Sequence, residues 1–277
     1  MLEVIDKGRC SDEHPVPLLF VHGSWHGAWC WDEHFLDFFA ARGYRAIAVS
    51  MRGHGASPGR DRLRWTRIRD YVADVAQTAA TLSTPPVVIG HSMGGFIVQH
   101  YLRRHAAAGA VLVAAIAPTG VYRVTLRIAR DHPREFVHVN AALRLGPLVA
   151  TPELARELLF SASMPDATVD SYQRRLQDES YLAFLDMLVL DLVKTKDVDR
   201  VPMLVLGAEH DAIVTVREVH RTAEVYGAEM QVFSDMAHDM MLEPGWQLVA
   251  ERIDDWLTAQ RFGHPAALGR NGGQPPP

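Results

Sequence analysis

Cysteine and long apolar runs are both scarce in this chain of 277 residues. The two cysteines, Cys10 and Cys30, could form at most one disulfide. A fold held together by disulfides is therefore excluded, and free thiols in a reducing compartment are favoured. No stretch approaches the roughly 18 apolar residues of a membrane-spanning helix, and segment 1–15 lacks the apolar run of a signal peptide. We therefore expect a cytoplasmic protein without a membrane span.

A strong charge of either sign is also missing. The chain has 28 basic and 33 acidic residues, which gives a net charge of -5 with histidine neutral. Because arginines are interleaved with acidic residues, neither nucleic acid nor an anionic membrane is expected as the main partner. The chain also lacks the HExxH metal motif, clustered metal-ligand spacings and the GxxxxGKS/T phosphate loop. Neither a metal nor an organic cofactor is therefore expected.

What the chain does contain is a repeated alternation of short apolar runs and longer helical patterns. The expected strands cover residues 17–22, 44–50, 87–90, 110–116, 202–207 and 230–233. The expected helices that alternate with them cover 31–41, 66–82, 94–104, 216–226 and 246–260. The runs are apolar throughout, which is typical of strands covered on both faces. We therefore predict an α/β fold, with a mostly parallel central sheet and helices on both faces.

The alternation stops between residues 119 and 199, where no convincing strand occurs. Helical patterns in this stretch include those at 153–159, 169–177 and 181–193. A helical insertion inside a sheet domain is typical of a lid. We therefore expect a core of 1–118 and 200–260 with a helical lid of 119–199. The tail, 261–277, has proline and glycine but no periodicity, so we expect it to be disordered.

The segment VVIGHSMGG, residues 87–95, carries the strongest chemical signal. Its residues 90–94 fit the pattern G-x-S-x-G between an expected strand and an expected helix, which is the context of a nucleophile elbow. A Cβ atom on Gly90 or Gly94 would clash in so tight a turn, so the two glycines allow Ser92 to protrude as a nucleophile. The alternative is an ordinary strand-to-helix turn with a spectator serine.

A serine hydroxyl needs a base, and the base needs an acid to orient it. In this kind of sheet the order along the chain is serine, acid, histidine. Asp211 follows the expected strand 202–207, and Glu209 is the second choice for the acid. His238 follows the last expected strand and is the candidate base. The competing roles are a helix N-cap for Asp211 and simple surface polarity for His238, one of 14 histidines.

An acyl-transfer site also needs donors for the oxyanion. The backbone N–H of Met93, directly after the candidate nucleophile, is one expected donor. The N–H of Ser24 is the other, because it follows the end of the first long strand and Gly23 allows close approach.

Two residues beside these donors are candidates for the substrate pocket, namely Trp25 and His91. The side chain of His26 and the tryptophans near it are more typical of packing within such a loop. A structural hydrogen bond is the more common role for a residue placed like His91.

These residues together resemble the α/β-hydrolase superfamily. The resemblance rests on His22-Gly23, RGHGAS at 52–57, GHSMGG at 90–95, Asp211 and His238, and it extends from residue 17 to residue 260. The loop HGSWHGAW also resembles the plant methylesterase and hydroxynitrile-lyase branch and its bacterial esterase relatives. The resemblance implies an α/β-hydrolase fold with a helical lid.

The chain departs from the lyases of that branch at two positions. They carry threonine after the strand-end histidine and lysine after the catalytic histidine, where this chain has Gly23 and Asp239. Without a lysine to balance the charge of cyanide, cyanohydrin cleavage is not expected. Dehalogenating relatives use aspartate as the nucleophile, whereas this chain has Ser92.

The resemblance implies a serine hydrolase that cleaves a carboxylic ester through an acyl-enzyme, with a small-molecule substrate and no cofactor. Apolar side chains in the expected lid suggest a substrate with an apolar group, although most of them are expected to pack the lid onto the core: Phe160, Met164, Phe184, Met187 and Leu188. The alternatives are a C–C bond hydrolase or cofactor-free perhydrolase, and a non-catalytic small-ligand receptor. Exposed lid helices could also pair two subunits into a homo-oligomer.

Overall fold

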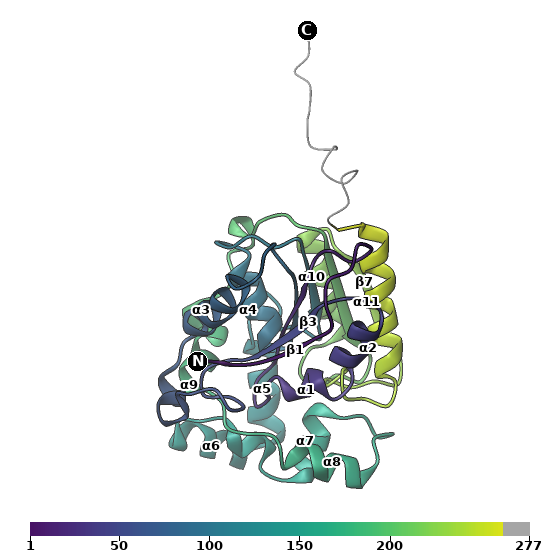
Figure 1. Cartoon of the computed structure of the whole chain (residues 1–277). Helices are drawn as coiled ribbons and strands as arrows, with labels where there is room; N and C mark the ends of the chain where they lie inside the picture. Colours follow the sequence, from purple (N-terminus) through teal and green to yellow (C-terminus); the bar gives the residue numbers. More distant parts are fainter. Residues whose placement is uncertain (263–277) are drawn as a thin grey trace.

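The computed structural model describes residues 1–262, which form one seven-stranded sheet with helices around it (Figure 1). The strand order is β1-β3-β2-β4-β5-β6-β7, and every neighbouring pair is parallel except β1 with β3. The strands are β1 (Glu3–Lys7), β2 (Leu18–Val21), β3 (Ala46–Ser50), β4 (Val87–His91), β5 (Gly109–Val113), β6 (Met203–Ala208) and β7 (Glu229–Phe233). The predicted mostly parallel sheet is confirmed.

The central strands are buried along their whole length, because helices cover both faces. Figure 1 shows α3 and α4 on one side of the sheet and α2 and α11 on the other. The helices of this part are α1 (Trp29–Asp32), α2 (Phe35–Ala41), α3 (Ile68–Ala79), α4 (Met93–Tyr101), α10 (Val216–Tyr226) and α11 (Trp246–Gln260). The expected helix 31–41 is broken, because His34 leaves the helical region with φ -143°.

Strand β1 was not predicted. Its sequence EVIDK is short and its burial alternates between half-buried and exposed, so it lacks the continuous apolar run of the other strands. It pairs antiparallel with β3 at the edge of the sheet, where one face meets solvent. Pairing with β3 supplies the backbone hydrogen bonds that stabilise this strand, and no apolar run in its own sequence indicates it.

The chain between β5 and β6 forms the helices α5 (Tyr122–Asp131), α6 (Pro133–Ala142), α7 (Pro152–Leu159), α8 (Asp166–Gln173) and α9 (Tyr181–Leu185). We call residues 119–199 the insertion. Figure 1 shows its helices gathered at one end of the sheet. The expected helix 181–193 is too long: α9 ends at Leu185 and a π-helical turn, Asp186–Leu190, follows. The Asp186 carboxylate turns toward the core, where it accepts hydrogen bonds from Arg67 and from the amide of Ile68.

Buried polar contacts tie the insertion to the core. The Glu179 carboxylate is fully buried and accepts hydrogen bonds from Tyr71 Oη (2.7 Å) and from His54 Nε2 (3.1 Å). Gln177 donates to Gly53 O at 2.8 Å and accepts from Gly55 N at 2.9 Å. The second half of the insertion is therefore docked onto the loop that carries RGHGAS.

Three remaining expectations concern the chain ends and thiols. The tail that we expected to be disordered lies outside the described residues from 263 onward, but Phe262 packs against the Trp256 ring with centroids 5.5 Å apart. Cys10 and Cys30 are free thiols. Among residues 1–262, no helix combines the length and the apolar character needed to cross a bilayer.

Candidate active site

Ser92 lies at the sharp turn between β4 and α4. Its backbone angles, φ 52° and ψ -119°, fall in a region that side-chain-bearing residues rarely adopt. The segments around the turn pack so closely against its two glycines that neither position has room for a Cβ atom, and this packing keeps Ser92 in its strained conformation. A Cβ atom on Gly90 would lie 2.5 Å from Gly94 O, and one on Gly94 would lie 2.3 Å from Val21 O. The sequence argument for both glycines is therefore confirmed by the packing.

The side chains of Ser92, His238 and Asp211 form one hydrogen-bonded chain. His238 Nε2 lies 2.8 Å from Ser92 Oγ, and His238 Nδ1 lies 2.8 Å from Asp211 Oδ2. All three residues are at least 91% buried, with exposed fractions of 5%, 1% and 9% for Ser92, His238 and Asp211. They come from the carboxyl ends of β4, β7 and β6, the edge where open α/β sheets bind ligands.

Asp211 is held by the turn that it begins. Its Oδ1 accepts from the amides of Ile213 (2.7 Å) and Val214 (2.8 Å), which leaves Oδ2 free for His238. The N-cap of α10 is Thr215, so Asp211 does not cap that helix. Glu209, the second choice for the acid, is exposed at the surface.

The charge of Asp211 decides the protonation of His238. Burial alone would lower the pKa of His238, but the charge of Asp211 and the hydrogen bond to it outweigh burial, and the nearby Asp239 adds to them. The pKa of His238 is therefore raised above its ordinary 6.5. A more basic imidazole is better suited to accept a proton from the Ser92 hydroxyl.

The two expected oxyanion donors come from neighbouring segments. Ser24 Oγ lies 3.5 Å from Met93 Sδ, so these two residues are in contact. Within residues 1–262, neither backbone amide has a hydrogen-bond acceptor. Gly23 allows the approach, because a Cβ atom there would lie 2.9 Å from Ser92 Cβ and 2.8 Å from His91 Nδ1.

The two candidate pocket residues both bind other parts of the protein. Trp25 is buried with φ 67°, and its Nε1 donates to Leu145 O of the insertion at 3.3 Å. His91 is buried and its Nε2 donates to His238 O at 3.0 Å. Burial, followed by the charge of His238, lowers the pKa of His91 to about 3, so this ring is neutral. His91 thus supports the backbone of His238.

Sequence reasoning missed Arg127, which reaches from the insertion to the Asp211 turn. Its Nη2 donates to Ala212 O (2.9 Å) and Ile213 O (3.0 Å). These carbonyls belong to the same two peptide groups whose N–H bonds hold Asp211 Oδ1. A donor on the carbonyl side polarises a peptide group and strengthens its N–H bond. No sequence pattern links Arg127 to a turn 85 residues away.

A second missed contact joins the insertion to the loop around His238. The Glu243 carboxylate accepts from Ser161 N at 2.7 Å and from Ser161 Oγ at 2.5 Å. The Asp239 amide donates to Leu159 O at 2.9 Å. Together with Trp25 and Arg127, these contacts connect the insertion to three of the four loops that carry the expected site residues, namely those after β2, β6 and β7.

Among the described residues, one trio of metal-ligating groups lies close together, formed by His91, His238 and Asp239. Both ring nitrogens of His238 are engaged by Ser92 and Asp211. His91 Nε2 and one Asp239 oxygen are engaged as well. His91 Nδ1 and Asp239 Oδ1 have no hydrogen-bond partner among the described residues, but without a free His238 nitrogen the trio offers at most two free ligand groups, and we assign no metal to it.

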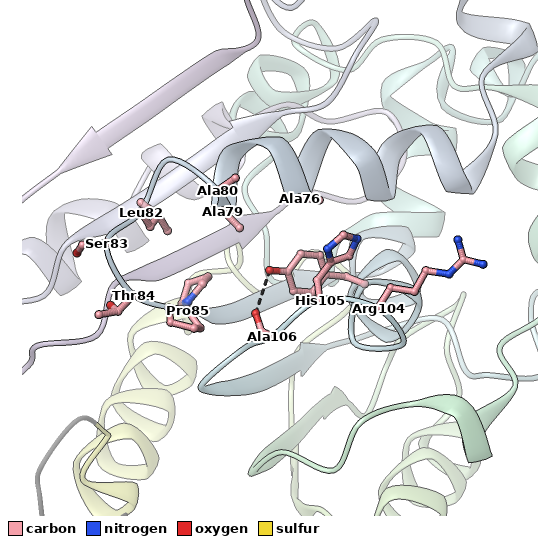
Figure 2. Close-up of a pocket in the computed structure, with 12 residues that line it drawn as sticks. Ala76, Ala79, Ala80, Leu82, Ser83, Thr84, Pro85, Arg104, His105 and Ala106 are labelled. Carbon is pink, nitrogen blue, oxygen red and sulfur yellow. Dashed lines mark hydrogen bonds between the residues drawn. The ribbon is translucent and has the colours of Figure 1, made fainter.

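A cavity of about 360 Å³ lies at the opposite end of β4 from Ser92 (Figure 2). It is lined by the end of α3, by residues 82–86 before β4, and by Tyr101, Arg104, His105 and Ala106 at and after the end of α4. None of these lining residues belongs to the Ser92 site. Figure 2 shows Arg104 beside the cavity. The Tyr101 hydroxyl donates to Ala106 O at 3.1 Å.

Comparisons with known proteins agree with the fold. Residues 18–252 match the model of the alpha/beta hydrolase family. The non-heme haloperoxidase of Rhodococcus erythropolis is 30% identical over 252 residues, which cover 81% of this chain and 86% of that protein. The bifunctional esterase/perhydrolase DCH of Acinetobacter calcoaceticus is 35% identical over 114 residues, or 37% of this chain and 38% of that protein. The rice esterase PIR7B is also related, which agrees with the resemblance of the loop HGSWHGAW to the plant methylesterase branch.

The solved structure of the esterase EaEST from Exiguobacterium antarcticum superposes with a TM-score of 0.72 at 19% identity, covering 92% of this chain and 95% of that one. The chain therefore belongs to the alpha/beta hydrolase family. By that membership it is an enzyme of the esterase- and lipase-like hydrolase class.

Proposed function

We propose that this enzyme hydrolyses a carboxylic ester of a small molecule through Ser92, His238 and Asp211. The observation that supports it best is the His238 imidazole, which lies 2.8 Å from Ser92 Oγ on one side and 2.8 Å from Asp211 Oδ2 on the other. His238 takes the Ser92 proton while Ser92 Oγ attacks the ester carbonyl. It then gives that proton to the leaving alcohol, and an acyl-enzyme remains.

Deacylation repeats these steps with water. His238 removes a proton from the water, the hydroxyl attacks the acyl carbonyl, and Ser92 leaves with the proton from His238. Asp211 stays ionised and stabilises the imidazolium in both halves of the reaction. The amides of Ser24 and Met93 donate to the oxyanion of each tetrahedral intermediate.

Residues 119–199 act as a lid over this site in the proposal. Contacts from Leu145, Arg127 and Ser161 to the site loops support this role. Phe160, Met164 and Met187 are buried, so these side chains pack the insertion rather than stand free. The apolar group of the ester is proposed from the apolar composition of the insertion.

Perhydrolysis is the second candidate. The Acinetobacter relative is named an esterase and perhydrolase, and the Rhodococcus relative a haloperoxidase. The chemistry differs only in the second half: hydrogen peroxide in place of water attacks the acyl-enzyme, which yields a peracid and free Ser92. C–C bond hydrolysis and ligand binding without turnover are further candidates, with no observation that favours them.

The cell compartment and assembly state are further parts of the proposal. The free thiols of Cys10 and Cys30 support a reducing, cytoplasmic location. Exposed apolar side chains on the insertion, including Tyr122, Leu126 and Val137, support pairing of two copies. Sedimentation equilibrium tests the pairing directly, and a purely monomeric protein would contradict it.

The experiment is a turnover assay with p-nitrophenyl esters of graded acyl length on the wild type and on Ser92→Ala. We expect a burst and turnover in the wild type, and loss of roughly 10⁴-fold or more in the folded variant. Added hydrogen peroxide that diverts the acyl group into peracid would favour the second candidate. Wild-type activity retained by Ser92→Ala would refute the mechanism, and no turnover of any ester would favour a C–C substrate or a receptor.

A further inference from the structure

A second pair of an acid and a histidine lies next to the Ser92 site. His26 Nε2 lies 3.0 Å from Asp239 Oδ2, and both residues have an exposed fraction of 0%. His26 belongs to the loop that follows β2, and Asp239 directly follows His238. The pair therefore joins the segment of one expected oxyanion donor, Ser24, to the segment of the candidate base.

The protonation of the pair follows from its neighbours. His26 Nδ1 lies 2.7 Å from Ser24 O, and a carbonyl can only accept, so this nitrogen carries a proton. The other ring nitrogen faces a carboxylate, so one further proton lies between His26 and Asp239. Burial opposes ionisation of Asp239, but the charge of His26 and its hydrogen bond lower the pKa of this carboxyl below the usual value. Asp239 is thus a carboxylate that faces the His26 ring.

Both ends of the pair are fixed. The Asp239 amide donates to Leu159 O at 2.9 Å, and the ring of His26 lies 5.3 Å from the Trp29 ring. One Asp239 carboxylate oxygen also lies within 4.8 Å of a His238 ring nitrogen. The hydrogen bond from His26 to the Ser24 carbonyl fixes the peptide group between Ser24 and Trp25, which adjoins the Ser24 amide through the Ser24 Cα atom.

We propose that His26 and Asp239 are positioning residues that hold the Ser24 amide and the His238 imidazole in one fixed geometry. This proposal rests on the proposed function, because only in that function do the Ser24 amide and the His238 imidazole have catalytic roles. A buried ion pair adds little net stability on average, since desolvation offsets the attraction. The pair instead fixes the orientation of the groups that it contacts, and a shift of about 1 Å in a catalytic group can cost about 100-fold in rate.

The test compares Asp239→Asn, His26→Gln and the double variant, which replaces the pair by two amides. We expect each single variant to lose roughly 10- to 100-fold in kcat with little change in KM. Affinity for an alkyl boronic acid, which forms a tetrahedral adduct on Ser92, should fall in proportion to kcat. Because the two residues act as one unit, the double variant should lose much less than the product of the two single losses.

Glu179→Gln is the matched control. The pair of His54 and Glu179 is also fully buried and its bond is 3.1 Å long, but it joins the core to the insertion and, among the described residues, shares no hydrogen bond with Ser24, Ser92 or His238. Removing the Glu179 charge should lower the melting temperature and leave kcat and boronate affinity nearly unchanged. An equal loss of kcat in this control would overturn the proposal, because any buried pair would then have the same effect.

The outcomes separate this proposal from the proposed function. The labelling rate of Ser92 by a fluorophosphonate, followed by intact mass, reports serine activation without a known substrate. Failure to label the wild type would overturn both proposals. A wild type that labels rapidly, with folded Asp239→Asn and double variants that label and turn over at nearly the same rate, would overturn the positioning role alone. If the single variants do not fold, the double variant decides.

Discussion

The sheet core and the insertion differ in the interactions that hold them in place. The central strands of the core are apolar and buried from end to end, and backbone pairing fixes where each strand stops. The insertion is partly exposed, and side-chain hydrogen bonds attach it to the core, as with Asp186 on the Ile68 amide and Glu179 on Tyr71. A sheet edge is thus a rigid place for a reacting group, whereas the insertion depends in addition on individual side-chain hydrogen bonds that single substitutions can remove.

The largest effect should follow from a change in the core. We expect Asp211→Asn to lower kcat by about 10⁴-fold, because the amide can hold His238 in the wrong tautomer. The measurement is steady-state hydrolysis of the best p-nitrophenyl ester. Glu209→Gln is the matched control, since Glu209 is exposed and lies two residues away. A similar loss in the control would contradict the assignment of the acid.

The turn that carries Ser92 gives the next largest effect, on folding. A Cβ atom in Gly94→Ala would meet two backbone carbonyls, at 2.3 Å from Val21 O and 2.5 Å from His22 O. Neither oxygen can move without distorting β2, so we expect the free energy of unfolding to fall by about 3 kcal/mol or more. Urea denaturation measures it.

Gly227→Ala is the control for that prediction. Gly227 has φ 61° but no atom within 4 Å of its missing Cβ. Only backbone strain remains, so the expected loss is about 1 kcal/mol. Equal losses at the two glycines would mean that the elbow is not tightly packed.

The pH dependence sharpens the comparison further. Protonated His238 cannot accept the Ser92 proton, so kcat/KM should fall on the acid side. The raised pKa of His238 places the midpoint above 6.5. Removing the Asp211 charge should move the midpoint to lower pH. Arg156→Met should not move it, because Arg156 donates to carbonyls within the insertion itself. An unchanged midpoint in Asp211→Asn would contradict the role of Asp211 as the charged partner of His238.

The same shift has a consequence for folding. A histidine whose pKa is raised by folding stabilises the protein fully below its unfolded value, and this contribution is lost as the pH rises through the folded value. Urea midpoints across that window should therefore fall with pH more in the wild type than in His238→Gln.

The smallest effect should come from the insertion. Arg127→Met removes the two donors on the Asp211 turn, and we expect kcat to fall about 3- to 10-fold with the fold retained. Arg156→Met is a matched control, because Arg156 also donates to two carbonyls, Ser161 O and Met164 O, but within the insertion itself. If both variants lose activity equally, the insertion acts through general packing and not through the Asp211 turn.

The sequence predicted the core better than the insertion for a physical reason. Runs such as 87–90 and 202–207 are buried on both faces, and local hydrophobicity alone identifies them. Strand β1 and the end of α9 depend on partners far along the chain, namely β3 and Arg67, which no local pattern contains.

The candidate site divides along the same line. Ser92, His238 and Asp211 were predictable because each follows a recognisable strand in a fixed order. Arg127 and the pair of His26 and Asp239 were not, since their partners meet only in three dimensions. The sequence shows that Asp239 stands where the related lyases carry lysine, but not that its carboxylate points at His26.

The most direct test of the central claim is to label the enzyme with a fluorophosphonate and map the adduct. We expect one adduct per chain on Ser92, with esterase activity lost in proportion to labelling, and no adduct in folded Ser92→Ala. An adduct on another residue, or full activity in a fully labelled enzyme, would contradict the role assigned to Ser92.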